Sequence, residues 1–130
     1  MEPRHEKIAK IVVDCGLRIH KDVGPGLLKS VYETVLASRL LKLGLQVERQ
    51  KPIQIRIDEI TFPDAFRADL LIDNLLLIEI KSLEKLAAVH HKQTLTYLRM
   101  MNLPLGLLIN FGGETFREGV SRVMNNHVKS

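Results

Sequence analysis

Hydrophobic residues recur at three- and four-residue steps through the first third of the chain, and this period indicates two amphipathic helices. The stripe expected of the first helix is Ile8, Ile11, Val12, Cys15 and Ile19. The segment Val23-Gly24-Pro25-Gly26 then breaks the helical pattern, because Gly and Pro favour turns. A second helix is predicted over residues 27–43, with Gly44 placed to end it. Its expected stripe is Leu28, Val31, Val35, Leu36, Leu40 and Leu43.

The middle third of the chain changes to the period of β-strands. Residues 53–57 alternate Ile with Gln and Arg, which predicts a strand with one solvated face. Two more strands are predicted over residues 66–72 and 75–81, with turns at Asp58-Glu59 and Asp73-Asn74. The third strand is almost continuously apolar, so we expect it to be central and covered on both faces.

The last third returns to a helical period over residues 83–101, and Asn102 and Pro104 close that helix. Its expected shared face is Leu86, Val89, His90, Gln93, Tyr97 and Met100. An apolar strand follows over residues 105–111, and an edge segment over 116–124. The order is therefore ααβββαβ. Because the last helix is a crossover between two strands, we expect an α/β fold whose mixed sheet contains a parallel central pair.

Composition narrows the class of protein. The 130 residues form one domain of ordinary size, 1–130, and 45% hydrophobic residues suffice for a core without disulfides. Cys15 is the only cysteine, so neither an intrachain disulfide nor a zinc–thiolate cluster is possible. No apolar run has the length of a signal peptide core or a membrane span. We expect a soluble, cytoplasmic protein that does not associate with membranes.

The charge balance favours a polyanionic partner only weakly. Nineteen basic residues against fifteen acidic ones give a net charge of +4, which helps attract a phosphate backbone and helps solubility equally well. Two Tyr, four Phe and no Trp leave little aromatic surface, which argues against a dedicated base-stacking module.

Two acids and a lysine stand out because they lie in apolar strands. Asp69 lies in one predicted strand, and Glu79 and Lys81 share a face of the next. Burying such charges costs several kcal/mol each unless they are paired or bind a cation. Two carboxylates and the carbonyl of Ile80 suit Mg²⁺ or Mn²⁺, and Lys81 would orient the attacking water in phosphodiester hydrolysis. The alternative is a buried salt bridge between Lys81 and one of the acids.

Four further residues are candidates for substrate binding. His90, Gln93 and Tyr97 fall on one stripe of the last helix and offer donors for phosphate oxygens, bases or waters. The alternative is a satisfied polar edge of the core. Arg67 would contact a phosphate, or pair with a surface acid.

Five segments, in chain order, resemble the motifs of one family: Gly26-Leu27-Leu28-Lys29-Ser30-Val31-Tyr32, Arg67-Ala68-Asp69, Glu79-Ile80-Lys81, His90 with Gln93-Thr94-Leu95-Thr96-Tyr97, and Leu107-Leu108-Ile109-Asn110-Phe111-Gly112. The family is the PD-(D/E)XK nuclease superfamily, and within it the small group named for its GxxExxY motif. The fourth segment also resembles the QxxxY motif of RecB-type nucleases. The resemblance implies a restriction-endonuclease-like core and a metal-dependent deoxyribonuclease-like site.

The chain departs from the motif at Lys29, where the family has glutamate. A lysine there would pair with Asp69 or Glu79 and take the space of the cation, since a divalent ion repels an ammonium. Alternatively, Glu33 would hold Lys29 away through an i,i+4 pair, or would itself serve as a substitute acid.

Three hypotheses follow from these patterns. The leading one is a Mg²⁺- or Mn²⁺-dependent nuclease that acts on DNA. The second is a catalytically silent homologue that binds nucleic acid or self-assembles, with Lys29 neutralising the acidic pocket. The third is a protein–protein module whose apolar edge near residues 116–120 forms a homo-dimer or larger homo-oligomer.

Overall fold

The structure is a computed structural model, and it describes residues 1–129. The elements follow in the order α1 (Arg4–Val23), α2 (Lys29–Lys42), β1 (Val47–Ile57), β2 (Ile60–Ile72), β3 (Leu76–Lys81), α3 (Ala88–Met101), β4 (Leu105–Asn110), the 3₁₀ turn η1 (Arg117–Gly119) and β5 (Val120–Met124). The predicted order ααβββαβ is confirmed, and β5 follows it as a short edge strand.

The five strands form one mixed sheet in the order β1-β2-β3-β4-β5. β3 and β4 are parallel, whereas the other neighbouring pairs are antiparallel. The crossover between the parallel strands contains α3, as the sequence predicts. The restriction-endonuclease-like α/β fold with a parallel central pair is therefore confirmed.

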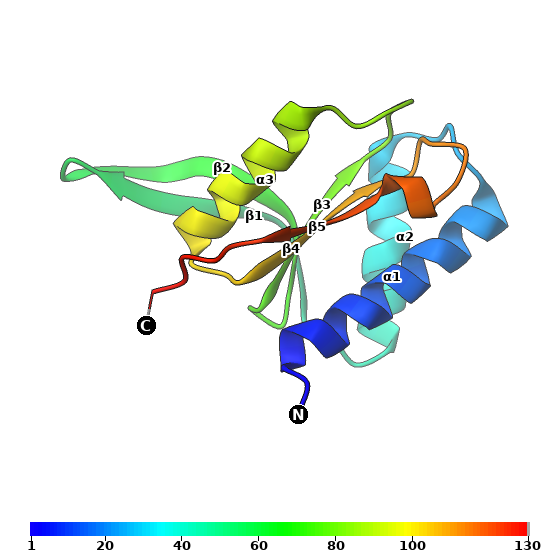
Figure 1. Ribbon diagram of the computed structural model, residues 1–130, viewed down its shortest axis with the longest axis horizontal. Coiled ribbons are helices and arrows are strands. Elements are labelled where there is room, and N and C mark those ends of the chain that lie inside the picture. Colours follow the sequence, from blue (N-terminus) through cyan, green and yellow to red (C-terminus); the bar gives the residue numbers. More distant parts are fainter. Residues whose placement is uncertain (130) are drawn as a thin grey trace.

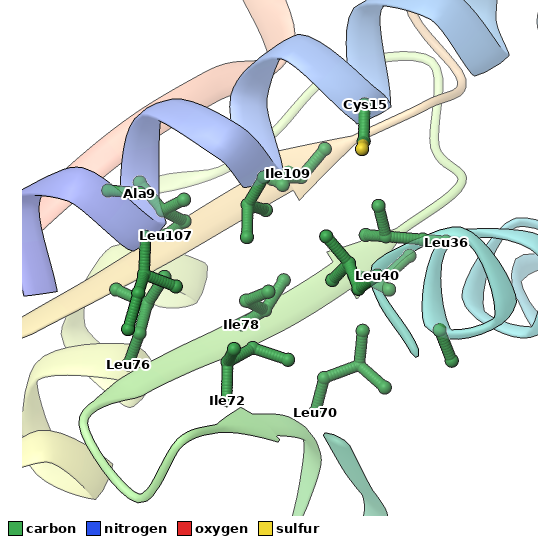
Figure 2. Packing of buried hydrophobic residues seen from close by; sticks show 14 of the residues in the cluster. Ala9, Cys15, Leu36, Leu40, Leu70, Ile72, Leu76, Ile78, Leu107 and Ile109 are labelled. Carbon is green, nitrogen blue, oxygen red and sulfur yellow. The ribbon is translucent and has the colours of Figure 1, made fainter. Parts of the chain in front are cut away.

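The helices cover the sheet from both sides (Figure 1). α1 and α2 pack on one face, and their apolar residues form a single core with alternate residues of the central strands. Figure 2 shows this packing, with Leu36 and Leu40 of α2 close to Leu70, Ile72 and Ile78 of the sheet. α3 lies on the opposite face, over a smaller cluster that includes Leu77 and Leu108.

The two hairpin turns have the backbone that their sequences indicate. Asp58 and Glu59 have φ values of 50° and 65°, and Asp73 and Asn74 have 50° and 54°. Positive φ at two consecutive central residues is the geometry of a type I′ turn, which matches the twist of the flanking strands. The β1–β2 hairpin is longer than the pattern predicts, since β1 starts at Val47 and β2 at Ile60, and it projects from the rest of the sheet (Figure 1).

Several expected helix faces are wrong. Leu28 is 75% exposed and Leu43 is 59% exposed, whereas Tyr32 and Glu33 of α2 are buried. α3 starts at Ala88 rather than at residue 83, and both Val89 and Met100 lie outside its buried face. The hydrophobic pattern misleads here because α2 turns a tyrosine and a charged residue toward the sheet.

The expected apolar edge near residues 116–120 is also partly wrong. Phe116 is buried and packs against Phe111 with ring centroids 5.6 Å apart. The edge strand β5 begins only at Val120. Within the described residues, no helix combines the length and the hydropathy that a membrane crossing requires.

Candidate active site

Asp69 of β2 and Glu79 of β3 are buried neighbours that accept hydrogen bonds from each other's strands. Glu79 Oε2 accepts the Asp69 N–H at 2.9 Å, and Asp69 Oδ2 accepts the Ile80 N–H at 2.8 Å. The backbone pairing of the two strands extends only to Leu70 and Ile78. The carboxylates therefore satisfy main-chain donors where the strand pairing stops, and this reciprocal arrangement holds both acids at one point of the sheet.

The closeness of the two acids leaves a charge problem at Glu79. Burial, followed by the charge of Asp69, raises the pKa of Glu79 from its ordinary 4.5 to about 7. The hydrogen bond from Asp69 N–H and the charges of Lys29 and Lys81 oppose this rise but do not cancel it. Among the described residues, Glu79 Oε1 accepts no hydrogen bond. Glu79 is thus a carboxyl group short of positive charge.

Lys29 supplies a positive partner for Asp69 but not for Glu79. Lys29 is the first residue of α2, and its Nζ lies 2.8 Å from Asp69 Oδ1. Partial burial lowers the pKa of Lys29, but the hydrogen bond with Asp69 and the nearby carboxylates raise it more, so its pKa lies above the ordinary value. The ammonium is therefore charged at neutral pH, in contact with one of the two candidate metal ligands.

Glu33 belongs to the same network through a second pair of residues. Its carboxylate accepts hydrogen bonds from Gln50 Nε2 at 2.8 Å and from Arg49 at 3.1 Å. The Gln50 amide also lies 3.0 Å from Asp69 Oδ1. The predicted pairing of Lys29 with Asp69 is confirmed. The alternative Lys29–Glu33 pair is wrong, because Glu33 is held by β1.

Gln50 is a site residue that the sequence analysis missed. Its backbone φ of 48° lies in the left-handed region, which residues other than Gly rarely adopt. Such backbone strain persists only where the surrounding structure holds it. Here Glu33 and Asp69 both accept hydrogen bonds from the Gln50 side-chain amide. No local sequence pattern marks Gln50, since its role depends on residues 17 and 19 positions away.

Lys81 lies next to the acids without pairing with either. Within the described residues its ammonium forms no salt bridge, so the alternative of a buried salt bridge to Lys81 is wrong, and the pairing lysine is Lys29. The Lys81 carbonyl accepts the Phe111 N–H at 2.9 Å, which fixes the end of β3. Lys81 and Lys29 both line a pocket of about 510 Å³, together with Gly26 and Ser82.

A clamp holds the loop that follows Lys81. The buried Asn110 side chain accepts the Leu83 N–H at 2.8 Å and donates to the Leu83 carbonyl at 2.9 Å. A Cβ on Gly112 would lie 2.2 Å from the Leu83 carbonyl oxygen, so only glycine fits there. These contacts explain why residues 83–87 are not part of α3, and they hold the loop in place beside Lys81.

The three residues of α3 that are predicted to bind substrate lie in different surroundings. The Tyr97 ring stacks on Phe66 with centroids 3.9 Å apart, and burial followed by the charges of Glu79 and Asp69 raises the pKa of Tyr97. His90 Nδ1 accepts the Ala87 N–H at 2.9 Å and thereby caps α3. Gln93 is exposed.

Arg67 contacts an acid of its own strand rather than the acidic pair. Its guanidinium lies 3.3 Å from Asp64 Oδ2, and both side chains are exposed. This contact agrees with the alternative in which Arg67 pairs with a surface acid.

The chemistry of the donor set fits a hard divalent ion. Carboxylate oxygens and main-chain carbonyls are the ligands that Mg²⁺ and Mn²⁺ prefer. Asp69 and Glu79 offer two carboxylates side by side, and Ile80, whose N–H donates to Asp69, offers a main-chain carbonyl. The described residues contain no group of three His, Cys, Asp or Glu that could hold a metal. An ion here would therefore rely on two acids, a carbonyl and water, a pattern usual for Mg²⁺.

A mixed sheet with a parallel central pair, carrying an aspartate on one strand and Glu-x-Lys on the next, defines a nuclease-like α/β protein. The chain matches the family model of the PD-(D/E)XK nuclease superfamily over residues 6–123, and it belongs to that superfamily. Nucleases of this superfamily generally depend on divalent metal ions. No curated protein and no solved structure matches the chain.

Proposed function

We propose that the protein is a Mg²⁺- or Mn²⁺-dependent nuclease that hydrolyses phosphodiester bonds in DNA, within a single domain spanning residues 1–130. Asp69, Glu79 and the carbonyl of Ile80 would hold the ion, and Lys81 would be catalytic. The proposal rests on one observation: two buried carboxyl groups meet at one point, and only one of them has a positive partner. The motifs in Gly26–Tyr32 and at His90 also support membership of the GxxExxY group.

Each residue has a separate part in this proposal. A bound ion supplies Lewis acidity that lowers the pKa of a water and neutralises charge on the phosphate. Lys81 would bind a phosphate oxygen or orient the attacking water, a role supported by its lack of salt bridges in the described structure and by the open pocket that it lines. The buried sheet holds Asp69 and Glu79 in fixed positions, which removes the cost of assembling them during the reaction.

Substrate binding would fall to four residues of α3 and β2. Because His90 Nδ1 accepts a hydrogen bond, its Nε2 carries the proton in the neutral ring and is free to donate to a phosphate. Tyr97 lies close enough to the acids to respond to their charge, so its hydroxyl is a second candidate donor. Gln93 and Arg67 are exposed and would act at the rim, Arg67 after leaving Asp64. The net charge of +4 favours a polyanion such as DNA.

A second candidate function is a catalytically silent homologue that binds nucleic acid. The Lys29–Asp69 contact at 2.8 Å favours it, because an ammonium already neutralises one of the two acids. This candidate predicts DNA binding without cleavage at every Mn²⁺ concentration.

Cleavage of supercoiled plasmid in Mn²⁺ tests the proposal. Lys81→Met and Asp69→Asn should each reduce cleavage at least about a hundredfold, the usual effect of removing one group that stabilises the transition state. Lys92→Met, which removes an exposed charge on α3, serves as the matched control and should cleave like the wild type. Cleavage that survives Lys81→Met unchanged would refute the assignment. Binding of plasmid without cleavage, in wild type and variants alike, would establish the silent candidate.

A further inference from the structure

The Lys29–Asp69 contact joins two elements that are distant in sequence. Lys29 begins α2 and Asp69 lies 40 positions later in β2, yet Nζ and Oδ1 are 2.8 Å apart. The aspartate side chain is only 5% exposed, whereas the lysine side chain is 41% exposed. The ammonium therefore contacts a buried carboxylate while about two fifths of the lysine side chain is exposed, so the side chain has solvent into which it can move.

Asp69 Oδ1 has no free acceptor position while Lys29 and Gln50 are in place. Oδ1 accepts from Lys29 and from Gln50, and Oδ2 accepts from the Ile80 N–H. A divalent ion bound to Oδ1 would lie within a few ångströms of the ammonium, where the two positive charges repel each other strongly because the site is poorly solvated. The ion and the ammonium therefore exclude each other.

Of the three donors on Asp69, Lys29 is the one that can leave at low cost. The Ile80 N–H belongs to the backbone of a buried strand, and Gln50 is also held by Glu33. Lys29 has no other salt-bridge partner among the described residues. An ion arriving at the acids would displace the lysine and leave the other two contacts intact.

We propose, on the basis of the function proposed above, that the Lys29 ammonium is the resident cation of the site and that a divalent ion binds only by displacing Lys29 from Asp69. The displaced lysine then has open space in the pocket that it shares with Lys81. In this arrangement two ammonium groups face the place of a substrate phosphate once the ion is bound.

Calorimetric titration of the metal-free protein with Mn²⁺ tests the inference without relying on activity. Lys29→Met removes the competing charge and should tighten Mn²⁺ binding by about tenfold or more, since a hydrogen bond to a charged group must no longer be broken. Lys29→Glu adds a carboxylate and should bind at least as tightly as Lys29→Met. Lys42→Met, an exposed lysine at the other end of α2, makes the same charge change and should bind Mn²⁺ like the wild type.

Thermal unfolding adds a readout that separates competition from a purely structural role. Without metal, Lys29→Met should unfold at a lower temperature than the wild type, because Asp69 loses its cation. Saturating Mn²⁺ should then raise the melting temperature of Lys29→Met more than that of the wild type, because tighter binding stabilises more.

The outcomes separate this inference from the proposed function. Equal Mn²⁺ affinities in wild type, Lys29→Met and Lys29→Glu would overturn the competition and leave the nuclease proposal standing. Binding in the variants but not in the wild type would support the competition and favour the silent homologue. No binding in any protein would overturn both the competition and the metal dependence.

Discussion

The two faces of the central sheet differ in the residue types that they present, although the same strands form both. On the face toward α1 and α2, β3 and β4 present Leu76, Ile78, Leu107 and Ile109 (Figure 2). These residues and Ile80 on the same face are all fully buried and all aliphatic. On the face toward α3, alternate residues of β3 change from Leu77 to Glu79 and Lys81 along the strand. One face is apolar throughout, whereas the other becomes polar at one end.

The helices match this difference. α1 and α2 together bury twelve residues, and α3 buries only Thr94 and Leu98. α3 covers its face of the sheet less completely, and the two buried acids lie on that face near the carboxyl end of β3. Packing among many apolar side chains holds the apolar face together, whereas specific hydrogen bonds hold each acid. Aliphatic packing and the acidic pair are thus divided between the faces, and Lys29 and Glu33 of α2 link the two through the Asp69 network. A change among the aliphatic residues alone should leave the acids largely unaffected.

The largest expected effect comes from a cavity on the apolar face. Ile78→Ala removes a fully buried side chain between the two helices and the sheet and should lower the free energy of unfolding by about 4 kcal/mol. Urea denaturation measures this loss, and Val89→Ala, at a position 63% exposed on α3, is the control with little effect. The folded fraction of Ile78→Ala should bind Mn²⁺ like the wild type. A matching loss of affinity would show that the two faces are coupled.

On the polar face, removing a charge should stabilise the metal-free protein. The pKa of Glu79 rises from 4.5 in the unfolded chain to about 7 in the fold, so the unfolded state loses its proton first as the pH increases. Stability is therefore lost between about pH 4.5 and pH 7, and this rise in pKa corresponds to about 3 kcal/mol at pH 8. Glu79→Gln avoids the loss and should be more stable than the wild type at pH 8 by up to that amount.

Urea denaturation in a chelator, at pH 8 and pH 4, measures this difference. At pH 4 the Glu79 carboxyl is protonated in both folded and unfolded states, so the two proteins should be equally stable. Glu84→Gln, an exposed acid in the following loop, is the matched control. Equal stability of wild type and Glu79→Gln at both pH values would mean that Glu79 already has a sufficient positive partner.

The apolar face was largely predictable from sequence because its signals are local. The period of two, the continuous apolar runs and the Asp73-Asn74 turn place β3 and β4 to within a residue of the observed Leu76–Lys81 and Leu105–Asn110. The first helix has the expected buried stripe except at Ile11, which is partly exposed. A buried aliphatic residue leaves its own mark in the pattern of its neighbours.

On the polar face, the sequence predicted which residues stand out but not the contacts that they make. Asp69, Glu79 and Lys81 are conspicuous in apolar strands, but the partner of Asp69 lies 40 residues away in α2. Gln50 has no local signature, since its unusual φ follows from two acids in other elements. The wrong start of α3 has the same origin, because Asn110 holds Leu83 through tertiary hydrogen bonds that no helical period reveals.

A smaller effect is expected where the polar face depends on one buried amide. Asn110→Ala removes the hydrogen bonds to both main-chain groups of Leu83 and should cost about 2 kcal/mol. Hydrogen exchange should accelerate at the Leu83 amide before the amides of β4 respond. Asn126→Ala, at an exposed position, is the control. Unchanged protection at Leu83 would show that the loop beside Lys81 is held by Gly112 and its neighbours alone.

The smallest effect tests whether Tyr97 belongs to packing or to chemistry. Its ring stacks on Phe66 at an interplanar angle of 5°, between α3 and the projecting hairpin. Tyr97→Leu should therefore lower stability by about 1 kcal/mol, the usual value of an aromatic pair, while Tyr97→Phe keeps the stack and should be as stable as the wild type. The Phe variant isolates the hydroxyl. A drop in plasmid cleavage with unchanged stability would place the hydroxyl at the substrate, whereas unchanged cleavage would assign Tyr97 to the packing of α3 against the hairpin.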